Sequence, residues 1–427
     1  MKKILSIILC VALMTTMLVG CGDKATSGQS DQGQKQGNEP VTLTFALWDK
    51  NQEPVMQEIV KKFEETHPNI KVDVQLTPYK QYFTKLETAA QGGEVPDVFW
   101  MNGPRFMKYA ANGILMPITE KVKSENIDLS KYPQGLIDLY SYKDNLYGIP
   151  KDWDVTALWY NKRLFDEAGV DYPTNEWTWE DMKEAAKKLT NTDKGVYGIA
   201  ARADTQEGAY NTIPACGGYI ISDDRTKSGY DTAGNAEGIK VWIDLIKEGV
   251  SPTVPEMDDT SPISMFQSEK VAMIYAASWN VPEFMKNEMI KDNVDLVVMP
   301  KIKGNRGAVI HGLSNVIYSG TKHPEEAWEL VKYLASKEAN EIWAKSGVVI
   351  PAHTEALDIW KNSYPNINLQ AFIDTLDYAT MYPSTVNTKW FEVEWDTYIE
   401  MWNEQISVEE GCKIIYDEMT KALKQDK

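Results

Sequence analysis

The amino-acid sequence predicts an α/β fold built in two lobes. Apolar residues alternate with polar or small ones along 41–47 and 70–76, as in strands, and recur at helical spacing along 55–63 and 79–91. Strands that alternate with helices indicate a largely parallel sheet covered on both faces. The chain has 427 residues. This length is too great for one compact core and predicts two lobes of ordinary domain size.

Breaks and caps delimit the individual elements. Pro54 suits the first turn of the helix that follows the first strand, and Gly92-Gly93 ends the second helix. The other expected elements are a strand at 97–101, a helix around 105–112, a buried strand at Trp159-Tyr160, a helix to 189 opened by a capping box from Thr178 to Asp181, a helix to 246 capped by Asn235, strands at 270–275 and 294–299, a helix from Pro324 to about 335, and a last helix capped at Ser407.

The N-terminus has the features of a secretory signal. Lys2 and Lys3 precede an apolar run at 4–19 that is short for a membrane span. Leu18-Val19-Gly20-Cys21 is the lipobox of bacterial lipoproteins. Residues 1–20 are therefore predicted to be a signal peptide, and Cys21 the lipid-bearing first residue of a protein on the outer face of the bacterial cell membrane. The alternatives are an ordinary signal peptide with an incidental cysteine and an uncleaved anchor helix.

Residues 21–40 are predicted to form a flexible linker behind the lipidated Cys21. From residue 22 onward this stretch is rich in Gly, Ser, Gln, Asp, Lys and Asn, and contains no aromatic residue. Such a composition buries too little apolar surface to offset the entropy lost on ordering. The folded part is therefore expected to begin at Val41.

Charge and cysteine usage restrict the partners. The net charge is −18, and loss of Lys2 and Lys3 makes it more negative. Nucleic-acid binding needs clustered positive charge, so a nucleic-acid partner is not expected. Besides Cys10 and Cys21 only Cys216 and Cys412 remain. A core of this size does not need a disulfide, and pairing of these two is not expected.

Motifs for catalysis or cofactor binding are missing from the sequence. The four histidines, His67, His311, His323 and His353, lie in no close metal-ligand arrangement. Gly92-Gly93 is not followed by the Gly-Lys-Ser/Thr of a phosphate loop. No metal, cofactor or catalytic residue is predicted.

An ordered series of segments resembles the family 1 extracellular solute-binding proteins that serve carbohydrate ABC importers. The segments are Phe63-Glu64 with Ile70-Lys71-Val72, Gly92-Gly93-Glu94-Val95-Pro96-Asp97-Val98, Tyr147-Gly148-Ile149-Pro150, Trp159 to Gly169, Trp177 to Asp181, Phe266 with Glu269 to Met273 and Trp279, Ala327 to Leu334, and Gly347 with Pro351. The resemblance extends from about Val41 to the C-terminus. Glu269 departs from it, since glycine is common there, and costs little if the turn needs no positive φ.

The resemblance implies a two-lobed periplasmic-binding-protein-like fold of type II, with a ligand cleft between lobes that close over the ligand. The lobes are expected at 41–150 plus about 309–355, and at 151–308 plus about 356–427. The implied function is capture of a mono- or oligosaccharide without chemistry and its delivery to the permease subunits of an ABC importer. The protein is expected to be a monomer.

A sugar site needs aromatic planes for stacking and carboxylates or amides for hydrogen bonds. Most of the candidates follow the ends of predicted strands or lie near the expected crossovers between lobes, where ligands of α/β proteins bind. The expected ligand-binding residues are Trp48, Asp49, Asn102, Asp152, Trp153, Trp279, Asn280, Gly312, Ser314, Tyr382, Trp390 and Glu394. Other aromatic residues, such as Trp242 and Trp328, are expected in the core.

Three alternatives stay open from the sequence. The protein could bind a peptide, a polyamine or another small solute, or serve as a surface adhesin that keeps the fold without transport. It could also be an exported glycoside hydrolase, although nothing singles out a catalytic pair among its 62 acidic residues.

Overall fold

The computed structural model describes residues 40–425. The predicted signal peptide, the lipidated Cys21 and linker residues 22–39 lie outside this range. Across the described residues, no helix is both long and apolar enough to cross a membrane.

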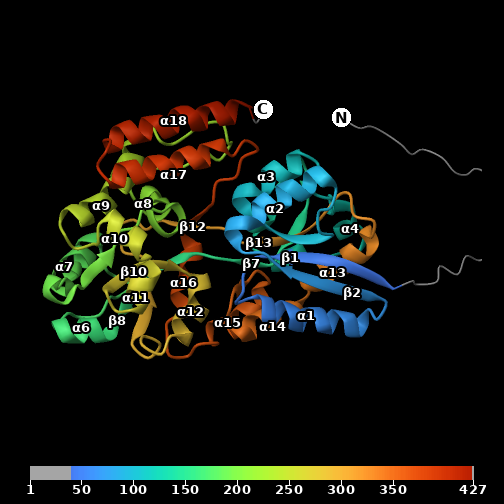
Figure 1. Cartoon of the computed structure of the whole chain (residues 1–427), viewed down its shortest axis with the longest axis horizontal. Helices are drawn as coiled ribbons and strands as arrows, with labels where there is room; N and C mark the ends of the chain where they lie inside the picture. The colour runs from blue at the N-terminus through green and yellow to red at the C-terminus, as the bar shows by residue number, and fades with distance from the viewer. Residues whose placement is uncertain (1–39, 426–427) are drawn as a thin grey trace, which may run out of the picture. The chain divides into compact units, whose positions relative to one another are not determined.

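Strands and helices alternate along most of the described chain (Figure 1). The strands are β1 (Val41–Leu47), β2 (Ile70–Leu76), β3 (Val98–Asn102), β4 (Ser141–Tyr142), β5 (Asn145–Leu146), β6 (Gly148–Pro150), β7 (Asp152–Trp153), β8 (Thr156–Asn161), β9 (Tyr197–Ala200), β10 (Val271–Ala277), β11 (Val294–Val297), β12 (Ala308–Ile310), β13 (Leu313–Ile317), β14 (Ile350–Pro351) and β15 (Ala379–Met381). The α-helices are α1 (Glu53–Thr66), α2 (Tyr79–Gly92), α3 (Gly103–Ala111), α4 (Thr119–Ser124), α5 (Gln134–Leu139), α6 (Lys162–Ala168), α7 (Trp179–Leu189), α8 (Tyr210–Ala215), α9 (Ala233–Lys247), α10 (Val254–Asp259), α11 (Pro262–Gln267), α12 (Val281–Lys286), α13 (Pro324–Leu334), α14 (Lys337–Ser346), α15 (Leu357–Lys361), α16 (Gln370–Asp374), α17 (Lys389–Trp402) and α18 (Val408–Gln425).

The first sheet has five strands in the order β2-β1-β3-β13-β6. β1 pairs in parallel with β2 and β3, as the alternating pattern predicts, but β13 is antiparallel to both β3 and β6. The prediction of a largely parallel sheet is therefore wrong. β6 and β13 belong to the segments by which the chain leaves this sheet and returns to it, and their direction follows from that route.

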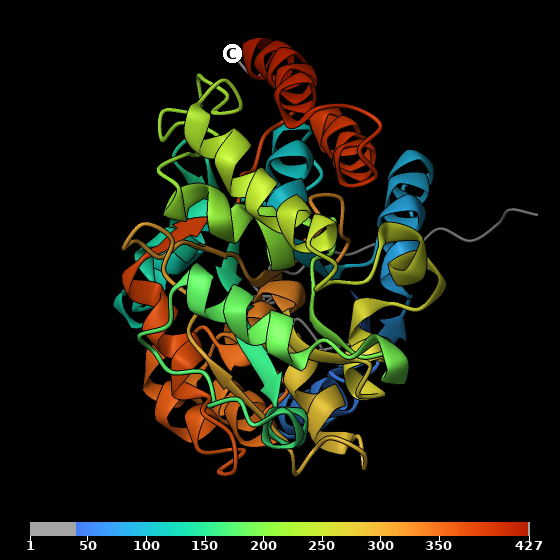
Figure 2. The same cartoon turned by 90° about the vertical axis from the view of Figure 1, so that its left-hand side faces the viewer.

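The second sheet has four strands in the order β11-β8-β10-β9. It is mixed as well, because β8 runs antiparallel to β10 and β11 while β9 runs parallel to β10. Every residue of β8 and β10 is buried, as the apolar runs in the sequence predict. The C-terminal helices α17 and α18 pack against each other, and α18 also packs on α9. The pair is red in Figure 2.

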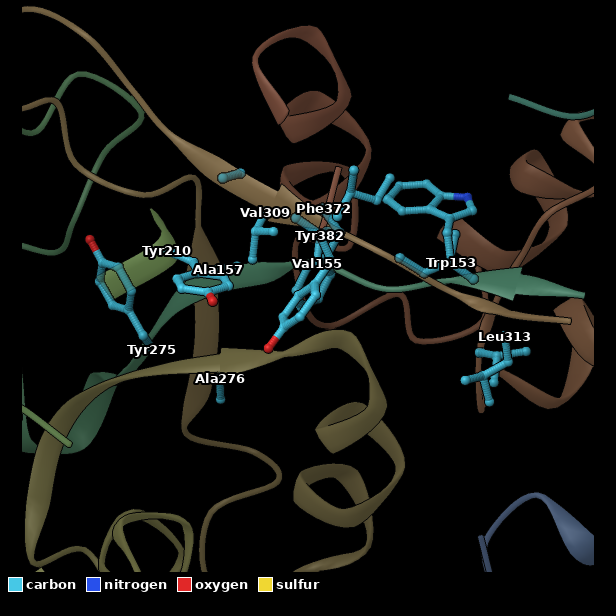
Figure 3. Close-up of a cluster of buried hydrophobic side chains, with 14 of the residues drawn as sticks. Trp153, Val155, Ala157, Tyr210, Tyr275, Ala276, Val309, Leu313, Phe372 and Tyr382 are labelled. Atoms are coloured by element: carbon cyan, nitrogen blue, oxygen red, sulfur yellow. The ribbon is translucent and has the colours of Figure 1, made fainter. Parts of the chain in front are cut away.

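Short strands join the two sheets. β7 pairs with β14, and β12 pairs with β15. Buried side chains line these crossings: Figure 3 shows Trp153 and Leu313 at one end of a cluster, Tyr210 and Tyr275 at the other, and Val155, Val309 and Tyr382 between them. The backbones approach closely, since a Cβ atom on Gly312 would lie 2.0 Å from the carbonyl oxygen of Asp152. Only glycine fits there.

Several local predictions are confirmed. Thr178 caps α7 in a capping box with Asp181, and the Ser407 hydroxyl accepts the Glu410 N–H at the start of α18. Trp242 and Trp328 are buried in the core.

Two local predictions need correction. Thr232, not Asn235, caps α9, because the Asn235 side chain is used in hydrogen bonds to the Tyr219 backbone. The turn at Glu269 does need a positive φ, +57°. An acidic residue there costs about 1 kcal/mol relative to glycine. Its carboxylate compensates by pairing with Arg163 and accepting from Asn161 at 3.0 Å.

Candidate functional site

A cavity of about 380 Å³ lies where the ends of both sheets meet the crossing strands. Its lining consists of aromatic rings, acidic side chains, amides and a few aliphatic residues. They are Trp48, Asp49, Gln52, Tyr79, Asn102, Asp152, Trp153, Asp154, Gln206, Ser278, Trp279, His311, Leu313, Val348 and Val349. We call this space the inner cavity. Six of the twelve residues expected to bind ligand lie on its walls: Trp48, Asp49, Asn102, Asp152, Trp153 and Trp279.

One wall comes from the first sheet. Trp48 and Asp49 directly follow β1, and Asn102 is the last residue of β3. β1 and β3 run parallel, so both strands bring these side chains to the same edge of the sheet. The partly buried Trp48 ring packs edge-on against Tyr82 and Trp100, with centroid distances of 4.8 and 5.3 Å. These contacts fix the plane that the indole presents to the cavity.

A second wall comes from the second sheet. Ser278 and Trp279 follow β10, and Gln206 belongs to a kinked turn at Thr205–Ala209. The buried Glu207 carboxylate ties these segments together by accepting the Ala277 N–H at 2.7 Å and the Asn280 amide at 2.9 Å. Glu207 thereby fixes the backbone next to both Gln206 and Trp279.

The crossing strand β7 provides the floor. Asp152 accepts the Leu313 N–H at 2.7 Å through Oδ1 and forms an ion pair with Lys151 through Oδ2. The Lys151 side chain is completely buried behind the floor, where its Nζ also donates to Gln52 Oε1 at 2.8 Å. The Gln52 amide in turn donates to Asp49 Oδ2 at 3.0 Å. This chain of contacts joins Asp49 and Asp152, two of the three acidic residues of the cavity, through one buried cation.

Three buried polar atoms of the lining residues have no hydrogen-bond partner within the described chain. They are Asn102 Oδ1, Trp153 Nε1 and His311 Nδ1, on residues that are 4%, 1% and 8% exposed. Buried polar atoms are nearly always paired, and leaving one unpaired costs roughly 1–3 kcal/mol. The lining residues therefore keep unused hydrogen-bonding capacity: an acceptor on Asn102, a donor on Trp153 and a ring nitrogen on His311.

His311, Gln206 and Asp154 lie close together at the crossing. His311 Nε2 lies 2.8 Å from Gln206 Oε1, the Gln206 amide donates to Asp154 Oδ1 at 2.5 Å, and His311 Nδ1 lies 3.2 Å from Asp154 Oδ2. Burial lowers the pKa of His311 to about 4, whereas burial and then Asp152 raise the pKa of Asp154. Burial therefore favours the uncharged form of both side chains.

A second space of about 480 Å³, the outer cavity, shares Tyr79, Asn102, Gln206, Trp279 and His311 with the inner cavity. Two further expected residues, Tyr382 and Glu394, line it. The Glu394 carboxyl is buried and accepts hydrogen bonds from Tyr210 and Tyr230. Burial, only partly opposed by these bonds, raises its pKa to about 7. Because the two cavities share lining residues, they form one site that is larger than the inner cavity alone.

Four expected residues do not line either cavity. Asn280 is bound to Glu207, and the close approach at Gly312 is to Asp152, not toward a ligand. The Ser314 hydroxyl is buried and donates to the Ile149 carbonyl at 2.9 Å. Trp390 is fully buried, and its indole N–H donates to Thr385 at 2.8 Å. The side chains of Asn280, Ser314 and Trp390 each have an internal hydrogen-bond partner that the sequence does not show.

Some lining residues are missing from the sequence prediction. Gln52, Tyr79 and Gln206 lie in or beside helices, where no strand end marks them. Trp395, 46% exposed, lines the outer cavity from α17. Five residues of helix rotate a side chain by about 140°, so Trp390 and Trp395 face different ways, and the sequence analysis chose the buried one.

No group of three or more His, Cys, Asp or Glu side chains within residues 40–425 is arranged to hold a metal ion. Cys216 and Cys412 are both free.

The sequence profile of the bacterial extracellular solute-binding proteins matches residues 49–341, more than half of the chain. This protein belongs to that family. The solute-binding protein is 26% identical over 363 residues to the galactooligosaccharide-binding protein of Bacillus subtilis (strain 168), an alignment that covers 82% of this chain and 81% of the relative.

Solved structures resemble the solute-binding protein over nearly its whole described length. An ABC substrate-binding protein from Listeria monocytogenes in complex with cycloalternan has a TM-score of 0.84 and 26% identity, covering 90% of this chain and 100% of that chain. The GacH receptor of Streptomyces glaucescens has a TM-score of 0.80 at 22% identity, covers 91% and 99%, and shows the fold alone. The predicted two-lobed α/β fold is confirmed. The family consists of extracellular binding proteins.

Proposed function

We propose that this protein captures a mono- or oligosaccharide in the cavity between its lobes and delivers it to an ABC importer, binding without chemistry. The observation that carries the proposal is the pair of buried, unpartnered atoms, Asn102 Oδ1 and Trp153 Nε1, in a cavity walled by indole rings. A sugar hydroxyl both donates and accepts, and the C–H faces of a sugar ring stack on indoles. The sugars named for the relatives support this class of ligand.

Isothermal titration calorimetry against a panel of neutral mono- and oligosaccharides, including galactooligosaccharides and cycloalternan, tests the proposal. Binding of at least one glycan with unchanged glycan recovered afterwards is expected. Failure of the whole panel, or turnover of a bound oligosaccharide, would contradict it.

Binding of a cationic solute such as a polyamine is a second candidate, because three acidic residues, Asp49, Asp152 and Asp154, line the inner cavity. A thermal-shift comparison separates the two candidates, since a ligand raises the melting temperature according to its occupancy. Spermidine raising it while no glycan does would favour the second.

The lobe boundaries that we propose are 41–150 with about 309–355, and 151–308 with about 356–427. The strand content of the two sheets supports them, because β13 returns to the first sheet and β8 to β11 form the second. α13 and α14 pack on α1, whereas α18 packs on α9.

We also propose that cleavage before Cys21 and a diacylglyceryl group on its thiol attach the monomeric protein to the outer face of the cell membrane. A single acyl chain binds membranes only weakly, whereas two chains give a stable anchor. With the linker, the anchor would raise the effective concentration of the binding protein at its permease. Mass spectrometry of the protein purified from membranes tests the modification.

A further inference from the structure

We propose that the inner cavity discriminates by charge, so that it accepts a neutral or cationic sugar unit and rejects one that carries a carboxylate. The inference rests on the proposed function and specifies the class of sugar. It concerns the unit that occupies the inner cavity.

The inner cavity has acidic walls and no cation to balance an anionic ligand. Asp49 and Asp152 are among its lining residues, and its described lining contains neither Lys nor Arg. Burial lowers the pKa of His311, the remaining basic side chain on its walls, to about 4, so this imidazole carries no charge near neutral pH. Burying an anion without a counter-ion is expensive, and placing it beside like charges adds several kcal/mol.

Lys151 cannot act as that counter-ion. Its side chain has no exposed surface, and its Nζ is bound to Asp152 and to Gln52 Oε1. The ammonium also lies between two indoles, 4.5 Å from the Trp100 ring centroid and 4.7 Å from that of Trp343. A ligand carboxylate could bind Lys151 only by displacing Asp152. The free energy lost by leaving the buried Asp152 carboxylate unpaired would exceed the free energy gained from the new ion pair.

The unpartnered atoms of the cavity give independent support. Asn102 Oδ1 needs a donor and Trp153 Nε1 needs an acceptor, and both residues are more than nine-tenths buried. A hydroxyl group fills both roles, whereas a carboxylate can only accept. A carboxylate would leave Asn102 Oδ1 unpaired. An ammonium, which can only donate, would leave Trp153 Nε1 unpaired, but its attraction to Asp49 and Asp152 offsets this loss.

The cationic side chains of the site line the outer cavity. Arg202 is paired there with Asp204 and Glu207, and Arg105 lies over the Phe83 ring at 4.7 Å. Neither arginine lines the inner cavity. An acidic unit could approach Arg105, but only at the outer end of the site.

Matched glycans test the proposal by isothermal titration calorimetry on the soluble mature protein. The probes are β-1,4-galactotriose and cycloalternan, each compared with derivatives carrying a carboxylate or an amine at the free C6 positions. The carboxylated forms should bind about 100-fold more weakly than the neutral forms, equivalent to about 2.7 kcal/mol, and the aminated forms no more weakly. A loss of less than tenfold for the carboxylated glycans overturns the proposal.

Two variants separate charge from size. Asp49→Asn keeps the shape of the wall but removes a charge. The difference in affinity between neutral and carboxylated glycans should therefore fall about tenfold, from about 100-fold to about 10-fold. Glu288→Gln, whose side chain is 83% exposed, removes the same charge from a surface position and should leave it unchanged. If Asp49→Asn still binds the carboxylated glycans about 100-fold more weakly than the neutral ones, the carboxylate is excluded by its size and not by its charge. That result would refute the electrostatic argument. If no neutral glycan binds at all, the proposed function itself fails, and this inference with it.

Discussion

Replacing Lys151 by methionine gives a strong test of how the site is held together. Methionine is similar in length and fits between the Trp100 and Trp343 rings, but it removes the charge that pairs with Asp152 and the donor that binds Gln52. Two buried acceptors lose their partner, while the carboxylate of Asp152 stays behind in the interior.

The magnitude follows from the burial of both partners. Removing one member of a buried ion pair typically costs about 3–5 kcal/mol, and the apolar contacts of methionine recover part of this. We expect a loss of about 3 kcal/mol. Unfolding entropy is about 2.1 cal/mol/K per residue, or about 0.8 kcal/mol/K for the roughly 390 folded residues, so the melting temperature should fall by about 4 °C.

Circular dichroism during thermal and urea unfolding measures the effect. The double variant Lys151→Met/Asp152→Asn removes both charges and should recover most of the stability, because a neutral pair carries no uncompensated charge. Lys345→Met, at a lysine 64% exposed, is the matched control and should change stability by less than about 0.5 kcal/mol. The reasoning is refuted if the single variant loses less than about 1 kcal/mol, or if the double variant is no more stable than the single one.

Three further predictions address binding, pH and anchoring. Trp279→Ala removes an indole that lines both cavities and should weaken glycan binding about tenfold in calorimetry. The circular dichroism spectrum should be unchanged. An affinity equal to that of the wild type would show that Trp279 is not part of the site. Because the pKa of Glu394 is raised to about 7 from 4.5, its contribution to stability is complete below pH 4.5 and is lost as pH rises through 7, in total about 3 kcal/mol. Urea unfolding between pH 4.5 and 8 should show this loss in the wild type and not in Glu394→Gln, and parallel pH profiles would contradict it. Cys21→Ala should release into the medium a protein that still binds glycan but supports uptake poorly, and normal uptake with full release would refute the tethering argument.

The fold could be predicted well from the sequence, because its strands and helices carry strong periodic signals. β1 and α1 are visible in the spacing of their apolar residues, and Trp48 could be placed at a strand end for the same reason. The mixed direction of the sheets could not be predicted this way. Whether β13 lies parallel or antiparallel to β3 depends on the route of the chain through the other lobe, and apolar periodicity does not record it.

The site was predictable where a residue follows a strand, and less so elsewhere. Asp49, Asn102 and Trp279 lie on the cavity walls as strand-end reasoning suggests. Ser314 and Trp390 are residue types that suit a sugar site, but each is turned inward to an internal hydrogen-bond partner. The partners lie far along the chain or depend on the rotation of a helix, so residue type alone cannot distinguish a ligand contact from an internal one.

The close packing at Gly312 has a consequence for how the lobes can move. The crossing segments are bonded to one another, Lys151 N–H to the Leu313 carbonyl at 2.8 Å and Ala352 N–H to the Lys151 carbonyl at 3.1 Å, so they form a narrow ribbon. A ribbon of this kind resists stretching, since that would break its hydrogen bonds, but twists and bends through small changes in φ and ψ. We therefore expect ligand binding to rotate one lobe about the other at nearly constant separation. An importer could then recognise the ligand-bound protein by the angle between its two lobes. A side chain at position 312 would push the crossing segments apart and alter this angle even in the absence of ligand.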